Sequence, residues 1–170
     1  SAVARKVPLG MTSLYNYFAD LTELLLALLE PVMATAEESY LGHLRHRWRD
    51  EDLDKHCMAF MRDYYAFWQK NTRILHLRNS LSEGNLDVRM AKHRIRMGIP
   101  LVELLTFQMD HDSEDTGGEA YCMATALFTG IDRLVAVRTT TEWSMQVSSS
   151  FYPLLDNQLR AEARLIELAV

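Results

Sequence analysis

The sequence predicts an all-α protein, and three observations support this prediction. Apolar residues recur at intervals of three and four along most of the chain, which is the spacing of one helix face. The alternating pattern of a half-buried strand is missing from every stretch long enough to form one. Glycine and proline are scarce, with seven and four among 170 residues, so few positions interrupt a helix.

A long helix is predicted to begin after Asp20. Asp20 and Glu23 have the spacing of a capping box, in which two side chains bond the free amides at a helix start. Pro31 lies inside this helix and cannot donate to the carbonyl of Ala27, so we expect a kink there. The apolar face consists of Leu25, Leu28, Leu29, Val32, Met33, Ala36, Tyr40 and Leu44.

Five further helical regions are predicted, and an acidic loop over residues 110–118 separates the third from the fourth. Gly98 and Pro100 predict a bend in the third region, and Pro153 predicts one in the fifth. The five regions span residues 53–68, 74–81, 86–109, 121–138 and 142–168.

The composition is that of a soluble protein with a sizeable core, since 48% of the residues are hydrophobic and 24% are charged. No apolar run reaches the roughly 18 residues of a membrane span, and no signal-peptide pattern is present. Cys57 and Cys122 lie in apolar helical contexts, which favours a reduced, cytoplasmic setting.

The net charge is −5, yet residues 1–18 contain Arg5 and Lys6 and no acidic residue. A small basic end on an acidic body is compatible with local DNA contact.

Residues 3–25 are the most informative segment. They predict a helix end, a tight turn, a second short helix and the capped start of the helix at Asp20. The short helix carries one apolar anchor, Leu14, among hydroxyl, amide and aromatic side chains. Such side chains on so short a helix suit the edge of a DNA groove better than a protein core. These side chains are Thr12, Ser13, Tyr15, Asn16 and Tyr17.

This segment resembles the DNA-reading half of the tetracycline-repressor (TetR/AcrR) family of bacterial transcription regulators. The family pattern is Ile/Val-Ala-x-x-Ala-Gly-Val-Ser-x-Gly/Thr-Thr/Ser-Leu-Tyr-x-His/Tyr-Phe-x-x-Lys-x-x-Leu, and the chain gives VARKVPLGMTSLYNYFADLTEL from Val3 without a gap. Pro8 replaces the usual glycine of the turn, Val7 replaces a small alanine, and Leu21 replaces a lysine that meets a DNA phosphate. The family's first helix and most of its second are expected to precede Val3.

The resemblance implies two domains: a partial helix-turn-helix DNA-binding domain over residues 1–20, and a helical ligand-binding and dimerisation domain over residues 21–170. In the family, the last two helices of each chain pair with those of a second copy in a four-helix bundle. A homodimer is therefore expected. Residues of the matching type are Leu127, Ile131, Leu134, Phe151, Leu155 and Leu159.

The function implied is that of a ligand-responsive transcriptional repressor. It would bind a palindromic operator in double-stranded DNA and be released by a small hydrophobic effector, with no enzymatic activity, cofactor, metal or membrane partner. Matching positions places Met11, Thr12 and Asn16 nearest the base edges, and Ser13, Tyr15 and Tyr17 nearest the phosphates. A tilt of the helix that begins at Asp20, with bending at Pro31, is the expected link between ligand and DNA.

The middle helices of the family enclose a ligand pocket, and ten residues here are candidates for lining it. Nine methionines and six phenylalanines favour a deformable, apolar cavity. For any single residue, an ordinary core position is the more probable interpretation. The candidates are Tyr64, Phe67, Trp68, Leu77, Met97, Leu101, Leu105, Phe107, Tyr121 and Phe128.

Two alternatives remain open: an α-helical small-molecule-binding protein or enzyme without a DNA-binding role, and a scaffold that binds only protein. If the protein is an enzyme, a titratable group in a cleft should have a strongly shifted pKa. If it is a regulator, we expect a dry apolar cavity and a two-fold dimer, and if it is a scaffold, we expect no cavity.

His43 and His46 have a metal-ligand spacing but lack a third ligand. The basic cluster Arg89, Lys92, Arg94 and Arg96 is interpreted as a polar helix face rather than a site for an anionic ligand.

Overall fold

The computed structural model describes residues 17–83, 87–109, 118–140 and 154–170, which form helices, turns and short connections without a strand. The predicted all-α class is therefore confirmed for these residues. Two 3-10 turns, Leu41–Leu44 and Asp50–Asp52, join the α-helices. The helices are α2 (Leu21–Ala34), α3 (Ala36–Ser39), α4 (Leu53–Lys70), α5 (Thr72–Glu83), α6 (Val88–Met109), α7 (Glu119–Arg138) and α9 (Leu155–Ala169).

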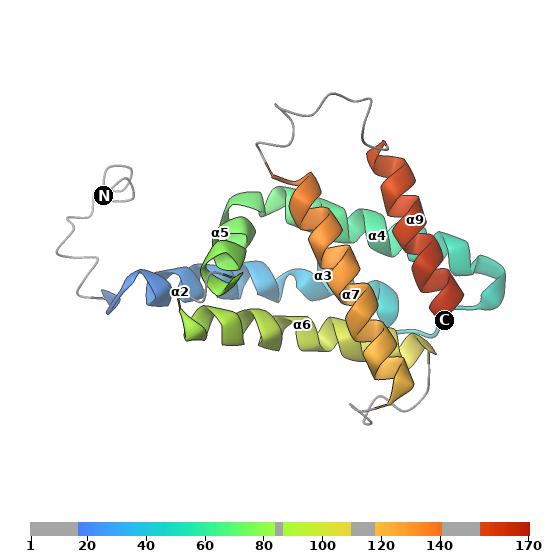
Figure 1. The fold of residues 1–170 in the computed structure, drawn as a ribbon, viewed down its shortest axis with the longest axis horizontal. Coiled ribbons are helices and arrows are strands. Elements are labelled where there is room, and N and C mark those ends of the chain that lie inside the picture. The colour runs from blue at the N-terminus through green and yellow to red at the C-terminus, as the bar shows by residue number, and fades with distance from the viewer. Residues whose placement is uncertain (1–16, 84–86, 110–117, 141–153) are drawn as a thin grey trace.

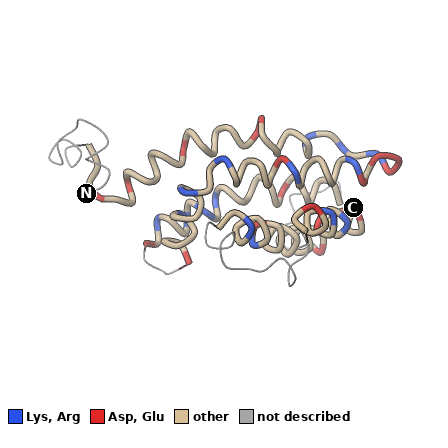
Figure 2. The backbone as a smooth tube through the Cα atoms, turned by 90° about the horizontal axis from the view of Figure 1, so that it is seen from above, with Lys and Arg blue, Asp and Glu red and all other residues tan. Residues whose placement is uncertain are grey.

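The helices form two layers. α2 and α6 lie side by side along the long axis, α4 packs beside α3 and the first 3-10 turn, and α7 and α9 cross over this layer (Figure 1). α7 packs mainly on α6, and α9 packs mainly on α4. Viewed from above, charges of both signs are interspersed along the chain (Figure 2). The core lies between the two layers.

The start of α2 has one of the two hydrogen bonds of the predicted capping box, and the second is shifted by one residue. Asp20 Oδ1 accepts from the backbone amide of Glu23 at 2.9 Å, and Glu23 Oε2 accepts from the amide of Ala19 at 2.6 Å. The glutamate thus reaches the amide one residue before the cap. Both side chains satisfy amides that a helix start leaves without intrahelical partners, so α2 has a well-defined beginning.

The expectation of one kinked helix through Leu44 is wrong beyond Ala34. α2 continues past Pro31 and ends at Ala34, after which the chain forms the single turn α3 and the first 3-10 turn. Tyr40 leaves the helical conformation with φ of −148°, and its buried ring packs edge-on against Tyr64 with centroids 4.8 Å apart. The break after Ala34 occurs at Thr35, whose amide and hydroxyl both donate to the carbonyl of Val32, and burial of the Tyr40 ring coincides with the end of α3.

The other helices begin and end close to the predicted positions. α4 and α7 begin within two residues of the prediction, while α5 is longer at both ends. α6 continues through Gly98 and Pro100 to Met109. The first part of the last predicted region lies outside the described residues, and its second part is α9.

Gln108 anchors the segment between the first 3-10 turn and α4. Its amide nitrogen donates to the carbonyls of Leu44 and His46 at 2.9 and 3.0 Å, and its amide oxygen accepts from the backbone amide of Trp48 at 3.0 Å. Gln108 is fully buried, so these bonds satisfy a polar group that would otherwise destabilise the core. They hold the irregular segment against the end of α6.

Candidate ligand-binding site

A small cavity lies between α4, α5, α6 and α7. Its volume is about 20 Å³, room for about one water molecule. Aromatic and aliphatic side chains form most of its wall, and two arginines and one aspartate complete it. The wall is formed by Met33, Tyr40, Tyr64, Phe67, Trp68, Leu75, Arg78, Arg94, Met97, Gly98, Leu101, Phe128 and Asp132.

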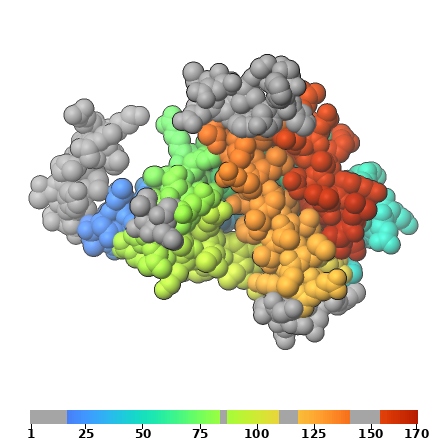
Figure 3. Space-filling view, in the orientation of Figure 1, coloured from blue at the N-terminus to red at the C-terminus, as the bar shows by residue number. Residues whose placement is uncertain are grey.

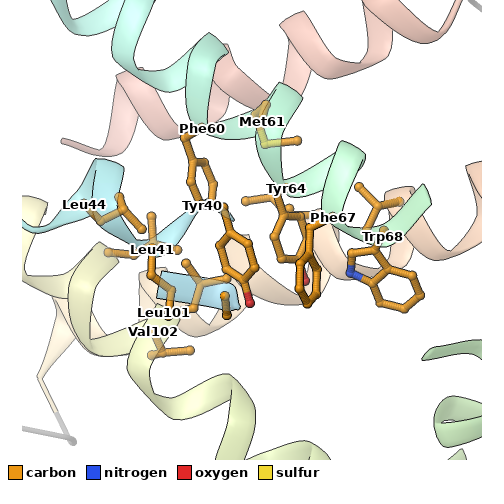
Figure 4. Packing of buried hydrophobic residues seen from close by; sticks show 14 of the residues in the cluster. Tyr40, Leu41, Leu44, Phe60, Met61, Tyr64, Phe67, Trp68, Leu101 and Val102 are labelled. Atoms are coloured by element: carbon orange, nitrogen blue, oxygen red, sulfur yellow. The ribbon is translucent and has the colours of Figure 1, made fainter. Parts of the chain in front are cut away.

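The aromatic wall comes from α4. Tyr64, Phe67 and Trp68 stand three and four residues apart, so they share one helix face, and all three are buried. Figure 4 shows these rings projecting from α4 beside the ring of Tyr40. The centroid of the Tyr40 ring lies 5.1 Å from that of Phe67. This is the contact range of interacting aromatic pairs, so the wall is closely packed.

Asp132 of α7 is the centre of a buried polar network. It is 4% exposed, and its Oδ1 accepts from the hydroxyl of Tyr64 at 3.0 Å. Its Oδ2 accepts from Nη2 of Arg94 at 2.9 Å, and Nη1 of Arg94 donates to Glu83 at 3.1 Å. Both carboxylate oxygens of Asp132 are thus engaged, as a buried charge requires.

The two buried tyrosines are neutral hydrogen-bonding groups. Burial raises the pKa of Tyr64 well above its ordinary value, and the charge of Asp132 raises it further. Burial also raises the pKa of Tyr40, with Arg78 acting in the opposite direction. Tyr64 therefore keeps the proton that it donates to Asp132. The hydroxyl of Tyr40 has no hydrogen-bond partner among the residues that the structure describes.

Arg78 of α5 contributes a second buried guanidinium, with only 6% of the residue exposed. Its Nε and Nη2 both donate to Oδ1 of Asn79, at 3.1 and 3.0 Å, and its guanidinium carbon lies 5.7 Å from the centroid of the Trp68 ring. Burial lowers the pKa of Arg78 and Asp132 raises it, and a guanidinium remains charged in such a site. Within the described ranges, no carboxylate oxygen lies within 4 Å of it.

Gly98 of α6 allows the ring of Phe128 to close the cavity. A Cβ atom at this position would lie 2.9 Å from Cε1 of Phe128, which is closer than carbon atoms normally approach. The absence of a side chain therefore lets α6 and α7 pack tightly beside the cavity. The neighbouring Met33 and Met97 have flexible side chains that can adapt to a different occupant.

Six of the ten predicted pocket residues line this cavity: Tyr64, Phe67, Trp68, Met97, Leu101 and Phe128. The other four lie elsewhere. Leu105 is fully buried in the core, and Tyr121 packs against that core from the start of α7. Leu77 is 40% exposed, and Phe107 lies in an outer groove beside Pro100.

Sequence reasoning missed Arg78 and Asp132, and it assigned Arg94 to a polar helix face. For Asp132 a signal was available, because it lies beside Ile131 and four residues from Phe128 in an otherwise apolar helix. For Arg78 no local signal exists, since its neighbour Leu77 fits the apolar pattern better. His93 is also buried, and neither of its ring nitrogens has a hydrogen-bond partner among the residues that the structure describes.

Two ion pairs join α6 to α2. Nη2 of Arg89 lies 2.7 Å from Oδ2 of Asp20, the residue that caps α2, and also 2.7 Å from Asp87. Nη2 of Arg96 lies 3.0 Å from Oε1 of Glu30 near the other end of α2. Hydrogen bonds from Arg89 lower the pKa of both Asp20 and Asp87. The helix that forms one wall of the cavity is therefore connected to the helix that follows the segment predicted to read DNA.

Most of the predicted DNA contacts, Met11, Thr12, Ser13, Tyr15 and Asn16, lie outside the described residues. Tyr17 is described, and it is 77% exposed.

The outer face of α7 is apolar and uncharged. No charged residue lies between Glu119 and Asp132, and Met123, Ala126 and Thr129 are exposed there. α7 and α9 lie next to each other on one face of the molecule (Figure 3). Leu165 and Leu168 of α9 are also exposed. The uncharged stretch of α7, with the exposed side chain of Met123, is a candidate interaction surface.

The residues predicted for the dimer lie mostly on the inner sides of these helices. Ile131 and Leu159 are buried inside the protomer, so a second copy would not contact them. Leu127, Leu134 and Leu155 are half-buried, and Phe151 lies outside the described residues.

No protein-family model matches the chain, and neither a curated protein nor a solved structure matches it.

Among the described residues, α7 meets the length and composition of a membrane span, with a mean hydropathy of 1.3 and 28% of that span buried. A core or interface helix of a soluble protein meets the same criterion. In the same residues, no group of three or more His, Cys, Asp or Glu side chains is placed to hold a metal ion.

Proposed function

We propose that this protein is a ligand-responsive transcriptional repressor of the TetR type. It binds a palindromic operator in double-stranded DNA as a cytoplasmic homodimer, and a small, largely apolar effector releases it. The resemblance of residues 3–24 supports the DNA-binding part of this proposal. The observation that carries the regulatory part is the pair of ion pairs that join α6, a wall of the cavity, to α2, which follows the DNA-reading segment.

The size of the cavity supplies a mechanism for release. An organic effector does not fit into about 20 Å³, so its binding must move α6 or the side chains between α6 and α7. Because Arg89 and Arg96 connect α6 to α2, a shift of α6 changes the position of Asp20. The effector must bind the shifted state more tightly, since a ligand with equal affinity for both states moves no population. Pro31 is the proposed point of bending in α2.

The outer face of α7 and the exposed leucines of α9 are the proposed dimer interface. A second copy would cover the uncharged stretch of α7, which includes Met123 and Ala126, and Leu165 of α9. In a two-fold dimer, two recognition helices meet half-sites about 34 Å apart on one side of the DNA. A change in their separation then suffices to lower operator affinity.

A small-molecule-binding protein or enzyme without a DNA-binding role is the second candidate. The polar network of Asp132, Arg94 and Tyr64 favours it, because a regulator was expected to have a dry apolar cavity. Its prediction is ligand binding without any operator recognition.

An electrophoretic mobility shift distinguishes the two candidates. The protein as its gene encodes it is titrated against DNA from upstream of that gene and against unrelated DNA of equal length. We expect specific binding with two chains per site. Asn16→Ala should weaken it by about tenfold, given 1–3 kcal/mol for a good base contact. Ser80→Ala, at an exposed position of α5 outside the proposed dimer interface, is the control. Equal affinity for both DNAs would contradict the proposal.

A further inference from the structure

The two guanidinium groups at the cavity are not equally paired. Arg94 forms ion pairs with Asp132 and, outside the cavity wall, with Glu83, whereas no ion pair of Arg78 is found in the described part of the chain. Both oxygens of Asp132 are already bonded, to Tyr64 and to Arg94. The cation of Arg78 therefore has a hydrogen-bond partner in Asn79 but no ion-pair partner in the described part of the chain. A buried charge without a counterion is strongly unfavourable, and an anion that binds beside it removes the penalty.

Two donors at the cavity have capacity for such an anion. Arg78 has five N–H groups, and its two recorded bonds both go to one oxygen of Asn79, which leaves Nη1 available. The hydroxyl of Tyr40, in a residue that is 96% buried, has no partner among the described residues and belongs to the same wall. A guanidinium fork together with a hydroxyl matches the two oxygens of a carboxylate.

The surroundings favour a monoanion with an apolar body. Asp132 lies in the same wall, so a doubly charged phosphate would meet a repulsive charge there. Phe67, Trp68 and Phe128 provide rings for the remainder of the ligand, and methionines beside them can repack around it.

We propose that the cavity binds an amphipathic organic acid, with its carboxylate on Arg78 and Tyr40 and its apolar body against the aromatic wall of α4 and α7. This inference deepens the proposed function, and it rests on that function only in naming the acid as the effector. The apolar part of the acid is an aromatic ring system or an acyl chain, and the experiment distinguishes these two possibilities.

Isothermal titration calorimetry on the full chain, without DNA, tests the site. The probes are 2-naphthoate and octanoate, each compared with its neutral amide, 2-naphthamide or octanamide. We expect at least one acid to bind about tenfold or more tightly than its amide, because hydrogen bonds to charged groups are the strong ones. The acid that binds more tightly shows whether the apolar part is aromatic or an acyl chain. Binding of neither acid, or equal binding of acid and amide, overturns the inference.

Variants assign the preference to Arg78. Arg78→Gln should abolish the preference for the acid, Tyr40→Phe should weaken acid binding several-fold, and Arg160→Gln on the exposed face of α9 should change nothing. If circular dichroism shows that Arg78→Gln is unfolded, Arg78→Lys keeps the charge and should lower acid affinity through loss of the fork. A preference for the acid that survives in the folded variant overturns the inference.

Operator release separates this inference from the proposed function. If an acid binds through Arg78 and the operator complex persists at saturation, the site stands and the proposed function fails. If neutral apolar compounds release the operator and no acid binds, the proposed function stands and this inference fails.

Discussion

Replacement of Asp132 should reveal how strongly the buried polar network supports the fold. Asp132→Ala removes a carboxylate that bonds both Tyr64 and Arg94, so it leaves a buried hydroxyl and a guanidinium without that partner. Loss of one member of a buried pair usually lowers the free energy of unfolding by about 3–5 kcal/mol. Arg94 is about one-third exposed and keeps Glu83. Water therefore replaces part of the lost interaction, and we expect Asp132→Ala to lower the free energy of unfolding by about 3 kcal/mol.

Two milder variants divide this loss. Asp132→Asn keeps the shape and an oxygen that accepts from Tyr64, so it should cost about 1.5 kcal/mol through the missing charge. Tyr64→Phe removes one hydrogen bond to a charged acceptor and should cost a similar amount, about 1.5 kcal/mol. In the Asp132→Ala background, Tyr64→Phe should cost little, because the hydroxyl that it removes has already lost its acceptor.

Urea unfolding followed by far-UV circular dichroism, at one protein concentration, measures these values. Glu103→Ala, which removes an exposed carboxylate from α6, is the control and should stay within about 0.5 kcal/mol of the parent. A coupling free energy of about 1 kcal/mol or more between the two sites is expected. Additive effects, or a loss below about 1 kcal/mol for Asp132→Ala, would refute the network described above.

Three further predictions concern the cavity, the start of α2 and the dimer. Gly98→Ala places a methyl group 2.9 Å from the ring of Phe128, so the affinity for the acid measured by calorimetry should fall several-fold. A gain in helix propensity of about 1 kcal/mol limits the loss of stability. Unchanged affinity would count against the proposed position of the ligand. Arg89 lowers the pKa of Asp20 below 3.8, so its stabilising effect is present above that pH and is lost as the pH falls through the folded-state pKa. Asp20→Asn should therefore destabilise the protein in urea at pH 7 and have less effect at pH 3, and a difference that does not change with pH would be inconsistent with this pairing. Ala126→Arg on the outer face of α7 should convert dimers to monomers in sedimentation velocity, whereas Ser80→Arg, at an exposed position of α5, should not. A dimer that survives Ala126→Arg would locate the interface elsewhere.

The features that the sequence predicted well depend on short-range spacing. The capping pair Asp20 and Glu23 is separated by three residues, and its geometry follows from helix structure alone. The wall formed by Tyr64, Phe67 and Trp68 follows from the three- and four-residue repeat of one helix face. Neither prediction requires knowledge of a distant segment.

The features that it did not predict depend on contacts between distant segments. Leu77 was expected to face inward, yet the adjacent Arg78 is buried and Leu77 is 40% exposed. A charged residue is normally exposed, and this one is buried because Trp68 and Asn79 lie against its guanidinium. In the same way, the ring of Tyr40 packs on α4, more than twenty residues away, at the point where the turn α3 ends.

A titration of the operator complex tests the central claim most directly. The acid that calorimetry selects is added to complexes of the parent protein and of Arg78→Gln, and the fraction of bound DNA is measured. We predict release of the parent protein near the dissociation constant of the acid, and release of the variant at concentrations about tenfold higher or more. DNA that stays bound at saturating acid, or equal release of both proteins, would contradict the account.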